Sequence, residues 1–335
     1  MNELDFLNVE TTENKIINFY ASNKILLEYI EKIDSYAIIK YFYKITNNAK
    51  IKKIENLINE LQLFLQIDKI KLTVDNLKGL IVFELSKQDR KILNFTDLKD
   101  TKKEGLTACV GKDTNNKEIF INIEKAPHLL IAGATGSGKS CLINSIITSL
   151  INKYDENKLK LILIDVKQVE FIQYNNLNNL AAPVVTEIEK AFEILNKIIA
   201  IMANRYKLLN EKNYKNIQEY NKKEREKLCY YVTVVDEFSD LIMQYEEIET
   251  LICRIAQLGR AAGIHLIIAT QRPSAETVTG RIKANIPERI ALSVTSGINS
   301  KIILDKTGAE KLTGQGDFIY KKSNGEEIRG QGALI

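Results

Sequence analysis

The run Ile131-Ala-Gly-Ala-Thr-Gly-Ser-Gly-Lys-Ser140 constrains the fold of this chain more than any other stretch. It matches G-x-x-x-x-G-K-[ST], in which glycines let a loop curl so that backbone N–H groups face a chain of phosphates at a helix start. The apolar run Pro127-His-Leu-Leu130 predicts a strand in front, and apolar residues at helical spacing from Leu142 to Ile151 predict a helix behind. A glycine loop without a ligand is the alternative. The context favours a phosphate-binding loop for a nucleoside triphosphate.

Two side chains of this loop predict its chemistry. Lys139 is expected to meet the β and γ phosphates of ATP as a point charge, and the Ser140 hydroxyl is expected to ligate Mg²⁺. The candidate nucleotide-binding residues are Gly133, Ala134, Thr135, Gly136, Ser137, Gly138, Lys139, Ser140 and Cys141.

Composition sets broad limits on the remaining possibilities. The chain has 335 residues, enough for two domains, and 45% of them are hydrophobic, as in ordinary globular proteins. A net charge of +4 requires that any basic surface be local. No apolar run is long enough to span a membrane, the N-terminus lacks a signal-peptide pattern, and the four cysteines lack metal-ligand spacing. We expect a soluble cytoplasmic protein without structural zinc or a membrane span of its own.

The chain divides by composition near residue 100. All four prolines and 13 of the 16 glycines lie at or beyond Pro127, and Lys99–Gly105 has the composition of a polar linker. Residues 1–34 have apolar spacing typical of helices and no site chemistry, so we expect a removable helical appendage. Residues 35–100 predict a small α+β subdomain, and residues 101–335 predict the phosphate-loop domain.

In the third part, apolar strands alternate with helices. The runs 160–165, 230–235 and 264–270 are continuously apolar, which predicts a parallel sheet covered by helices on both faces. Such sheets bind ligands at the carboxyl ends of their strands. We therefore expect the loop, the acidic pair Asp236-Glu237, Thr270 and Gln271 to lie at one edge.

The acidic pair after Val232-Thr-Val-Val235 predicts ATP hydrolysis. Asp236 can hold the water shell of Mg²⁺, and Glu237 can orient and deprotonate the attacking water. A strand that ends in an acid is common, but together with the upstream phosphate loop the pair indicates an ATPase rather than a protein that only binds nucleotide.

Several segments resemble the motor of the FtsK/SpoIIIE double-stranded DNA translocases. They include Ala261–Ser274 with its Thr-Gln-Arg-Pro, Thr279–Pro287, and Asp165-x-Lys-x-x-Glu170. The resemblance spans about residues 127–335, and the preceding α+β unit is similar to that family's small motor subdomain. It implies a RecA-like P-loop NTPase core, a homohexameric ring, and ATP-driven movement of duplex DNA through its channel.

The resemblance also implies roles for single residues. Gln271 corresponds to the sensor of the γ-phosphate, and Arg260 to the arginine that reaches the neighbouring subunit's nucleotide. A surface arginine at a helix end is the alternative for Arg260, and Arg254 is the second candidate. The cations expected to track DNA phosphates in the channel, or else to form an ordinary solvated surface, are Arg272, Lys283 and Lys301, with Arg281 nearby.

Differences from the family suggest where the motor works. The sequence shows no winged-helix domain after the motor and no membrane domain before it. We therefore expect a free-standing motor that serves a plasmid or another mobile element. Two rivals stay open: a secretion-type ATPase that pumps protein, and a nucleotide-gated module that binds DNA without moving. Stimulation of ATP turnover by duplex DNA tests the first, and displacement of a triplex strand tests the second.

Overall fold

The computed structural model describes residues 11–87, 91–100 and 105–335, which form two compact units. The first unit contains the described residues up to Ile92 together with Thr114–Lys117, and the second contains the rest. Part of the expected linker, residues 101–104, and residues 1–10 of the expected appendage lie outside the described residues.

The first unit is a four-stranded antiparallel sheet covered by three helices. The strand order is β1-β2-β4-β3, and the core gathers Tyr20, Tyr43, Leu61 and Phe83, all fully buried. The elements are α1 (Thr12–Ser22), β1 (Leu27–Asp34), β2 (Ile38–Ile45), α2 (Ile51–Asn56), α3 (Ile58–Leu65), β3 (Ile70–Asp75) and β4 (Leu80–Ser86).

The expectation that residues 1–34 form a helical appendage is wrong in two respects. The helix α1 ends at Ser22, because Lys24 adopts a left-handed backbone with a φ of 60°, and the chain continues as β1 paired with β2. The helix also belongs to the core: Ile16 and Tyr20 are fully buried, and the Tyr20 hydroxyl donates to the Ile54 carbonyl over 3.2 Å. The apolar spacing from Ile25 to Ile33, which indicates a helix, is equally compatible with the half-exposed edge strand β1.

The second unit is a nine-stranded sheet with order β6-β5-β13-β12-β11-β7-β10-β9-β8. The strands from β11 to β8 are parallel, as predicted, and the four on the other side of β11 are antiparallel. The strands are β5 (Thr107–Asp113), β6 (Glu118–Asn122), β7 (His128–Ala132), β8 (Leu159–Ile164), β9 (Tyr230–Val235), β10 (Ile264–Thr270), β11 (Glu288–Leu292), β12 (Asp317–Lys321) and β13 (Glu327–Gly332).

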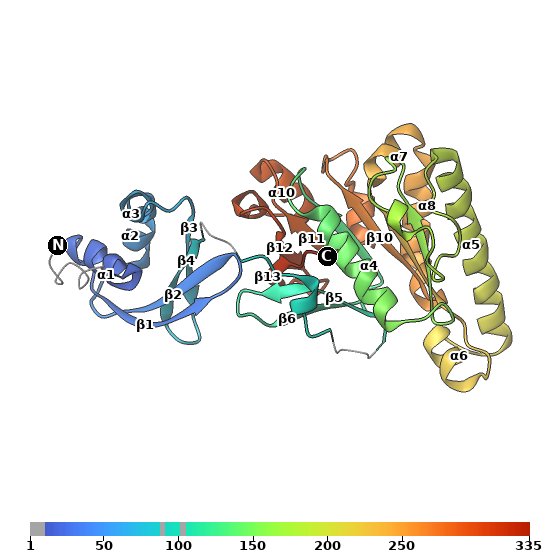
Figure 1. Cartoon of the computed structure of the whole chain (residues 1–335), viewed down its shortest axis with the longest axis horizontal. Helices are drawn as coiled ribbons and strands as arrows, with labels where there is room; N and C mark the ends of the chain where they lie inside the picture. The colour runs from blue at the N-terminus through green and yellow to red at the C-terminus, as the bar shows by residue number, and fades with distance from the viewer. Residues whose placement is uncertain (1–10, 88–90, 101–104) are drawn as a thin grey trace, which may run out of the picture. The chain divides into compact units, whose positions relative to one another are not determined.

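Helices cover both faces of this sheet. In Figure 1, α4 crosses one side of the strands, whereas α5 and α8 run side by side. The strand β8 is apolar on both of its faces. Leu161 and Leu163 pack in the core beside α4, whereas Ile162 and Ile164 pack in the core beside α5 and α8. The helices are α4 (Lys139–Lys153), α5 (Ile188–Glu211), α6 (Ile217–Lys223), α7 (Phe238–Gln244), α8 (Glu247–Ala262), α9 (Gly280–Asn285) and α10 (Gly297–Leu304), with 3₁₀ turns at Phe95–Asp97, Ile172–Tyr174 and Ala309–Lys311.

This topology places the phosphate loop in the middle of the sheet. β7 lies between β11 and β10, and β9 follows β10, so the carboxyl ends of these parallel strands share one edge. The segments after β7, β9 and β10 are therefore neighbours in space. Among the described residues, every helix is too short or too polar to cross a lipid bilayer.

Candidate nucleotide-binding and hydrolysis site

The phosphate loop joins β7 to α4, and its glycines are required by shape. Gly138 caps α4 with a φ of 99°, and a Cβ built on it lies 2.5 Å from the Gly316 nitrogen. A Cβ on Gly133 lies 2.6 Å from the Ser137 hydroxyl, and Gly136 has a φ of 76°. A larger residue at Gly138 would therefore collide with the Gly316 backbone, and one at Gly133 with the side chains of Ser137 and Leu292. The left-handed φ at Gly136 also favours glycine.

Backbone hydrogen bonds hold the loop to its neighbours. The Ser137 nitrogen donates to the Ala134 carbonyl over 3.0 Å, and the Ser137 carbonyl accepts from the Gly316 nitrogen over 2.7 Å. The Ser137 hydroxyl is buried and has no partner within the described parts of the chain. An unpaired buried donor in a glycine loop at a helix N-terminus is what an anion would satisfy, so the loop fits phosphate.

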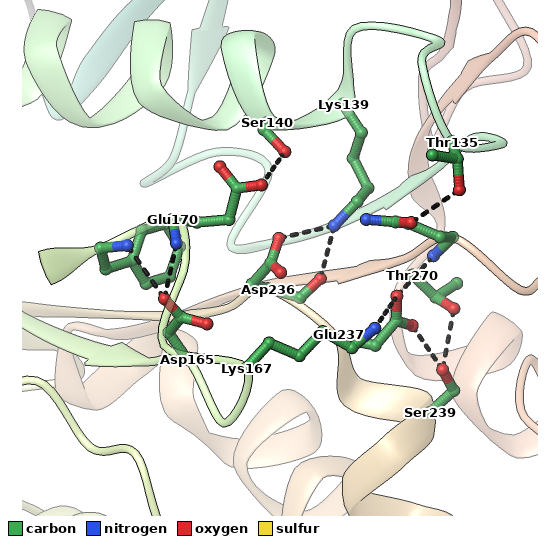
Figure 2. Close-up of polar contacts among 12 residues, drawn as sticks. Thr135, Lys139, Ser140, Asp165, Lys167, Glu170, Asp236, Glu237, Ser239 and Thr270 are labelled. Carbon is green, nitrogen blue, oxygen red and sulfur yellow. Dashed lines mark hydrogen bonds and ion pairs between the residues drawn. The ribbon is translucent and has the colours of Figure 1, made fainter.

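Lys139 and Asp236 form a buried ion pair in the centre of the site (Figure 2). The Lys139 ammonium donates to Asp236 Oδ1 over 2.6 Å and to the Asp236 carbonyl over 2.7 Å. The two residues are only 3% and 2% exposed. Burial raises the pKa of the Asp236 carboxyl, and the charge of Lys139 opposes that rise.

The Ser140 hydroxyl donates to Glu170 Oε1 over 2.6 Å. Glu170 lies on the loop after β8, and Asp165 holds that loop by accepting the backbone N–H groups of Glu170 and Phe171. Cys141 follows on α4 and is half-buried, which raises the pKa of its thiol.

Glu237 is held at the start of α7 by contacts from two directions. One carboxylate oxygen accepts the Ser239 hydroxyl, and the other accepts the Gln271 N–H over 2.9 Å. Ser239 in turn lies 3.0 Å from the Thr270 hydroxyl, and the Lys167 ammonium lies 3.7 Å from Glu237 Oε2. The expected general base is thus tied to the end of β10.

Gln271 connects β10 to the phosphate loop. Its side-chain oxygen accepts the Thr135 hydroxyl over 3.0 Å, at a cavity of about 310 Å³ that is also lined by Asn299. The candidate residues of the loop, Asp236, Glu237 and Gln271 therefore meet at one edge, as expected.

Oxygen atoms suited to Mg²⁺ gather on the α4 side of this edge. Ser140, Asp236 and Glu170 supply hydroxyl and carboxylate oxygens, and Asp165 Oδ1 is buried without a partner in the described structure. Within the described residues no three acidic, histidine or cysteine side chains form a complete ligand set. The arrangement fits a cation that keeps several of its waters, as Mg²⁺ does.

The structure does not bring the two candidate arginines into the site of their own chain. Arg254 and Arg260 are exposed on α8, and Arg260 lies just before β10 begins. The nucleotide site lies after the other end of β10, a strand of seven residues that spans about 20 Å. The exposed Arg260 at that end therefore lies too far away to reach the nucleotide site of its own chain.

The candidate DNA-binding cations differ in exposure and in whether they form an ion pair. Arg272, Arg281 and Lys301 are exposed, on the segment after β10, on α9 and on α10. Lys283 instead pairs with Asp305 over 2.8 Å. Asp305 also accepts Arg289 and Lys321, and these cations hold the pKa of its carboxyl well below its usual range.

Sequence reasoning missed several residues of the site. The motif Asp165-x-Lys-x-x-Glu170 contributed to the family resemblance, although nothing in its sequence specifies a role for either carboxylate. Thr270 was expected at this edge from its place at the end of a strand, whereas Ser239 has no signal at all, because its importance depends on how two strand ends face each other.

The chain is similar in sequence to known DNA translocases. A model of the FtsK/SpoIIIE family matches residues 96–275. The DNA translocase FtsK of Caldanaerobacter subterraneus is 39% identical over 343 residues, which cover 100% of this chain and 48% of that protein. The DNA translocase SftA of Bacillus subtilis is 40% identical, covering 86% of this chain and 32% of that protein. The chain thus spans less than half the length of these relatives.

Solved structures share the fold. The pCW3 conjugation coupling protein TcpA, in a monomer form with ATPγS, superposes with a TM-score of 0.69 at 27% identity, covering 98% of this chain and 95% of that one. The type VII secretion ATPase EccC of Thermomonospora curvata gives a TM-score of 0.63 at 24% identity, covering 72% of this chain and 31% of that one. The predicted fold class, a RecA-like P-loop NTPase core, is confirmed.

Proposed function

This chain belongs to the FtsK/SpoIIIE family, and we propose on that premise that it hydrolyses ATP to move double-stranded DNA. The observation that carries the proposal is the meeting of Lys139, Asp236 and Glu237 at the edge where the phosphate loop begins α4. The names of the relatives support DNA as the partner.

ATP binding changes the partners of the buried ion pair. The phosphates attract the Lys139 ammonium, so Lys139 leaves Asp236 for the β and γ oxygens. Asp236 would then be free to hold the water shell of Mg²⁺, and Ser140 would supply a ligand to the metal. When bound, the Mg²⁺ neutralises charge on the transferring phosphoryl group.

Glu237 serves as the general base of hydrolysis. It takes a proton from the attacking water as the water oxygen bonds to the γ-phosphorus and the bond to the β-phosphate oxygen breaks, which yields ADP and phosphate. Both of its oxygens already accept one hydrogen bond, from Ser239 and from the Gln271 N–H, and each keeps a further lone pair that can accept the attacking water. Gln271 senses the γ-phosphate, and its N–H group carries that signal to Glu237.

The site is completed by a neighbouring subunit in a homohexameric ring. A cation is needed to cover the charge on the γ-phosphoryl oxygens in the transition state, and Lys139 alone supplies one from the loop. Arg260 is exposed at the far end of β10, where it can reach an adjacent subunit's nucleotide.

Duplex DNA contacts the exposed cations Arg272, Arg281 and Lys301. They lie after β10, on α9 and on α10, and can neutralise phosphates without reading bases. Lys283 contributes less than the sequence suggests, because its charge is paired with Asp305. The match with a conjugation coupling protein supports service to a plasmid or another mobile element.

The test is the rate of ATP hydrolysis with and without duplex DNA. Wild-type protein should be stimulated by DNA, Lys139→Ala should lose tight ATP binding, and Glu237→Gln should bind ATP but hydrolyse it at least about a hundredfold more slowly. Normal turnover by Glu237→Gln contradicts the assignment of the base. Turnover indifferent to duplex DNA contradicts the proposed function.

A further inference from the structure

The segment between β8 and the 3₁₀ turn Ile172–Tyr174 carries the motif Asp165-x-Lys-x-x-Glu170, which has no role in the mechanism above. It lies beside the phosphate loop, because β8 ends at the same edge of the sheet as β9. Its contacts reach the residue that is expected to ligate the metal.

Asp165 fixes the path of this segment. Its side chain is 1% exposed, and Oδ2 accepts the Glu170 N–H over 2.8 Å and the Phe171 N–H over 3.0 Å. Its carbonyl accepts the N–H of Gln168, whose φ of 57° turns the chain back toward α4. Phe171 is fully buried and anchors the end of the turn. The position of Glu170 is therefore set by the fold and not by a freely moving loop.

The fixed turn presents the Glu170 carboxylate to Ser140. Figure 2 shows this carboxylate next to the hydroxyl, on the same side of the loop as Asp236. The Ser140 hydroxyl donates its hydrogen to Glu170 Oε1 over 2.6 Å, a length typical of a bond to an ionised acceptor. Because the hydrogen is directed to Glu170, the lone pairs of the Ser140 oxygen face away from it.

A serine ligates a metal with a lone pair, so the direction of its hydrogen decides where it can bind. Acceptors that fix the hydrogen of a ligating group orient that group and raise its basicity. We propose that Glu170 is a positioning residue for the Mg²⁺ of bound ATP: it holds the Ser140 hydrogen so that the oxygen meets the metal. The inference rests on the proposed function, which supplies MgATP as the ligand.

The proposal predicts a split between two measurements of nucleotide binding. Replacing Glu170 by Gln leaves a weaker, neutral acceptor for the Ser140 hydrogen and removes one negative charge beside the phosphates. In the presence of a chelator, Glu170→Gln should bind a fluorescent ATP analogue at least as tightly as wild type. The free Mg²⁺ concentration that half-saturates the metal-dependent gain in affinity should rise about tenfold or more, the usual cost of losing such a partner.

A matched control uses the same chemical change on an exposed glutamate. Glu187 makes a surface ion pair with Lys190, so Glu187→Gln should leave both measurements unchanged. Glu170→Asp keeps the charge but shortens the side chain, and it should give an intermediate Mg²⁺ requirement. Binding of Mn²⁺ with ADP, followed by electron paramagnetic resonance of the free ion, gives a second readout independent of turnover.

The outcomes separate the inference from the function. Equal loss of affinity by Glu170→Gln with and without metal assigns Glu170 a purely structural role and overturns the proposal, as does an unchanged Mg²⁺ requirement. If either occurs while wild-type ATPase is stimulated by DNA, the proposed function stands without this inference. If wild-type protein gains no affinity from Mg²⁺, both are overturned.

Discussion

Two buried threonines on neighbouring strands show how one hydroxyl group differs from another. Thr270, at the end of β10, has a hydroxyl 3.0 Å from that of Ser239 and accepts the Arg272 N–H over 3.0 Å. Thr233, in the middle of β9, is fully buried, and its hydroxyl has no hydrogen-bond partner in the described structure. The same substitution should therefore act in opposite directions.

Replacement by valine, which has nearly the same shape, tests this difference. Thr233→Val should raise the free energy of unfolding by about 1 kcal/mol, because it removes an unsatisfied buried polar group. Thr270→Val should lower it by about 1 to 2 kcal/mol, because it leaves the Arg272 N–H without its acceptor. Urea denaturation measures both. A loss of stability in both variants contradicts the hydrogen-bond assignment at Thr233.

Among single residues, the sequence predicts the site residues that lie close together along the chain in a recognisable motif. The glycines, Lys139 and Ser140 lie within one short run, and Asp236 and Glu237 directly follow an apolar strand, so a pattern finds them. A sequence pattern does not predict hydrogen-bond partners that are brought together only by tertiary structure. The bond between Ser140 and Glu170 joins the end of one loop to the start of a distant helix, and no spacing along the chain encodes it.

The strands β7 and β10 bury a histidine each, and the pair makes the protein sensitive to acid. Burial lowers the pKa of both His128 and His265 from 6.5 to about 3. The two rings are 6.4 Å apart, so a charge on one also opposes a charge on the other. In the native state both are therefore neutral at ordinary pH.

Unfolding releases these histidines to bind protons below pH 6.5. Their contribution to stability is complete above that pH and is lost as the pH falls toward 3, at about 1.4 kcal/mol per pH unit for each histidine. The variant His128→Asn/His265→Asn keeps groups that can replace the Nδ1 contacts to Leu266 and Pro127. Between pH 7.5 and pH 5.5, the free energy of unfolding measured with urea should fall less in the double variant than in the wild type. An equal loss would assign the acid sensitivity to other groups.

The helix α8 carries the prediction about neighbouring subunits. Arg260→Ala should bind nucleotide nearly normally and lose most turnover, since an arginine supplied from outside is worth about a thousandfold or more. Mixed with Glu237→Gln protein, it should regain partial ATPase activity, because some sites then combine an intact Glu237 with an intact Arg260. Arg254→Ala, exposed on the same helix, is the matched control.

Mixed rings decide between the arginines. If rings containing both variants form and no activity returns, Arg260 acts within its own subunit or only structurally. A strong defect in Arg254→Ala, with normal Arg260→Ala, transfers the role to Arg254.

Whole elements were predictable where both faces of a strand are buried. The runs 230–235 and 264–270 coincide with β9 and β10, because continuous apolar sequence leaves little choice. The edge strand β1 was mistaken for helix, since Leu26, Tyr29 and Ile30 are partly exposed and fit a helical stripe equally well. The antiparallel strands β12 and β13 are short and mixed in polarity, so the sequence gives them no clear signal.

At the scale of the whole molecule, DNA binding should tolerate any sequence and depend strongly on salt. Because cations that neutralise several DNA phosphates release counterions, affinity should fall by orders of magnitude as the salt concentration rises from about 50 to 200 mM. Arg272→Ala/Lys301→Ala should reduce the slope of log affinity against log salt while ATP binding stays intact. Lys283→Ala, which removes a cation already paired with Asp305, should change the slope less. If Lys283→Ala changes the slope as much as Arg272→Ala/Lys301→Ala does, the DNA does not follow the exposed cations.

The close approach of Gly138 to Gly316 has a consequence for how the protein is made. Ser137 in the phosphate loop accepts a hydrogen bond from Gly316, and Gly316 is held in turn by the N–H of Gly332 on β13. A ribosome produces the loop well before these supporting residues. A nascent chain that has emerged only as far as α10 therefore carries the complete nucleotide motif without the backbone that shapes it. Such a chain should acquire ATP affinity only when β12 and β13 emerge.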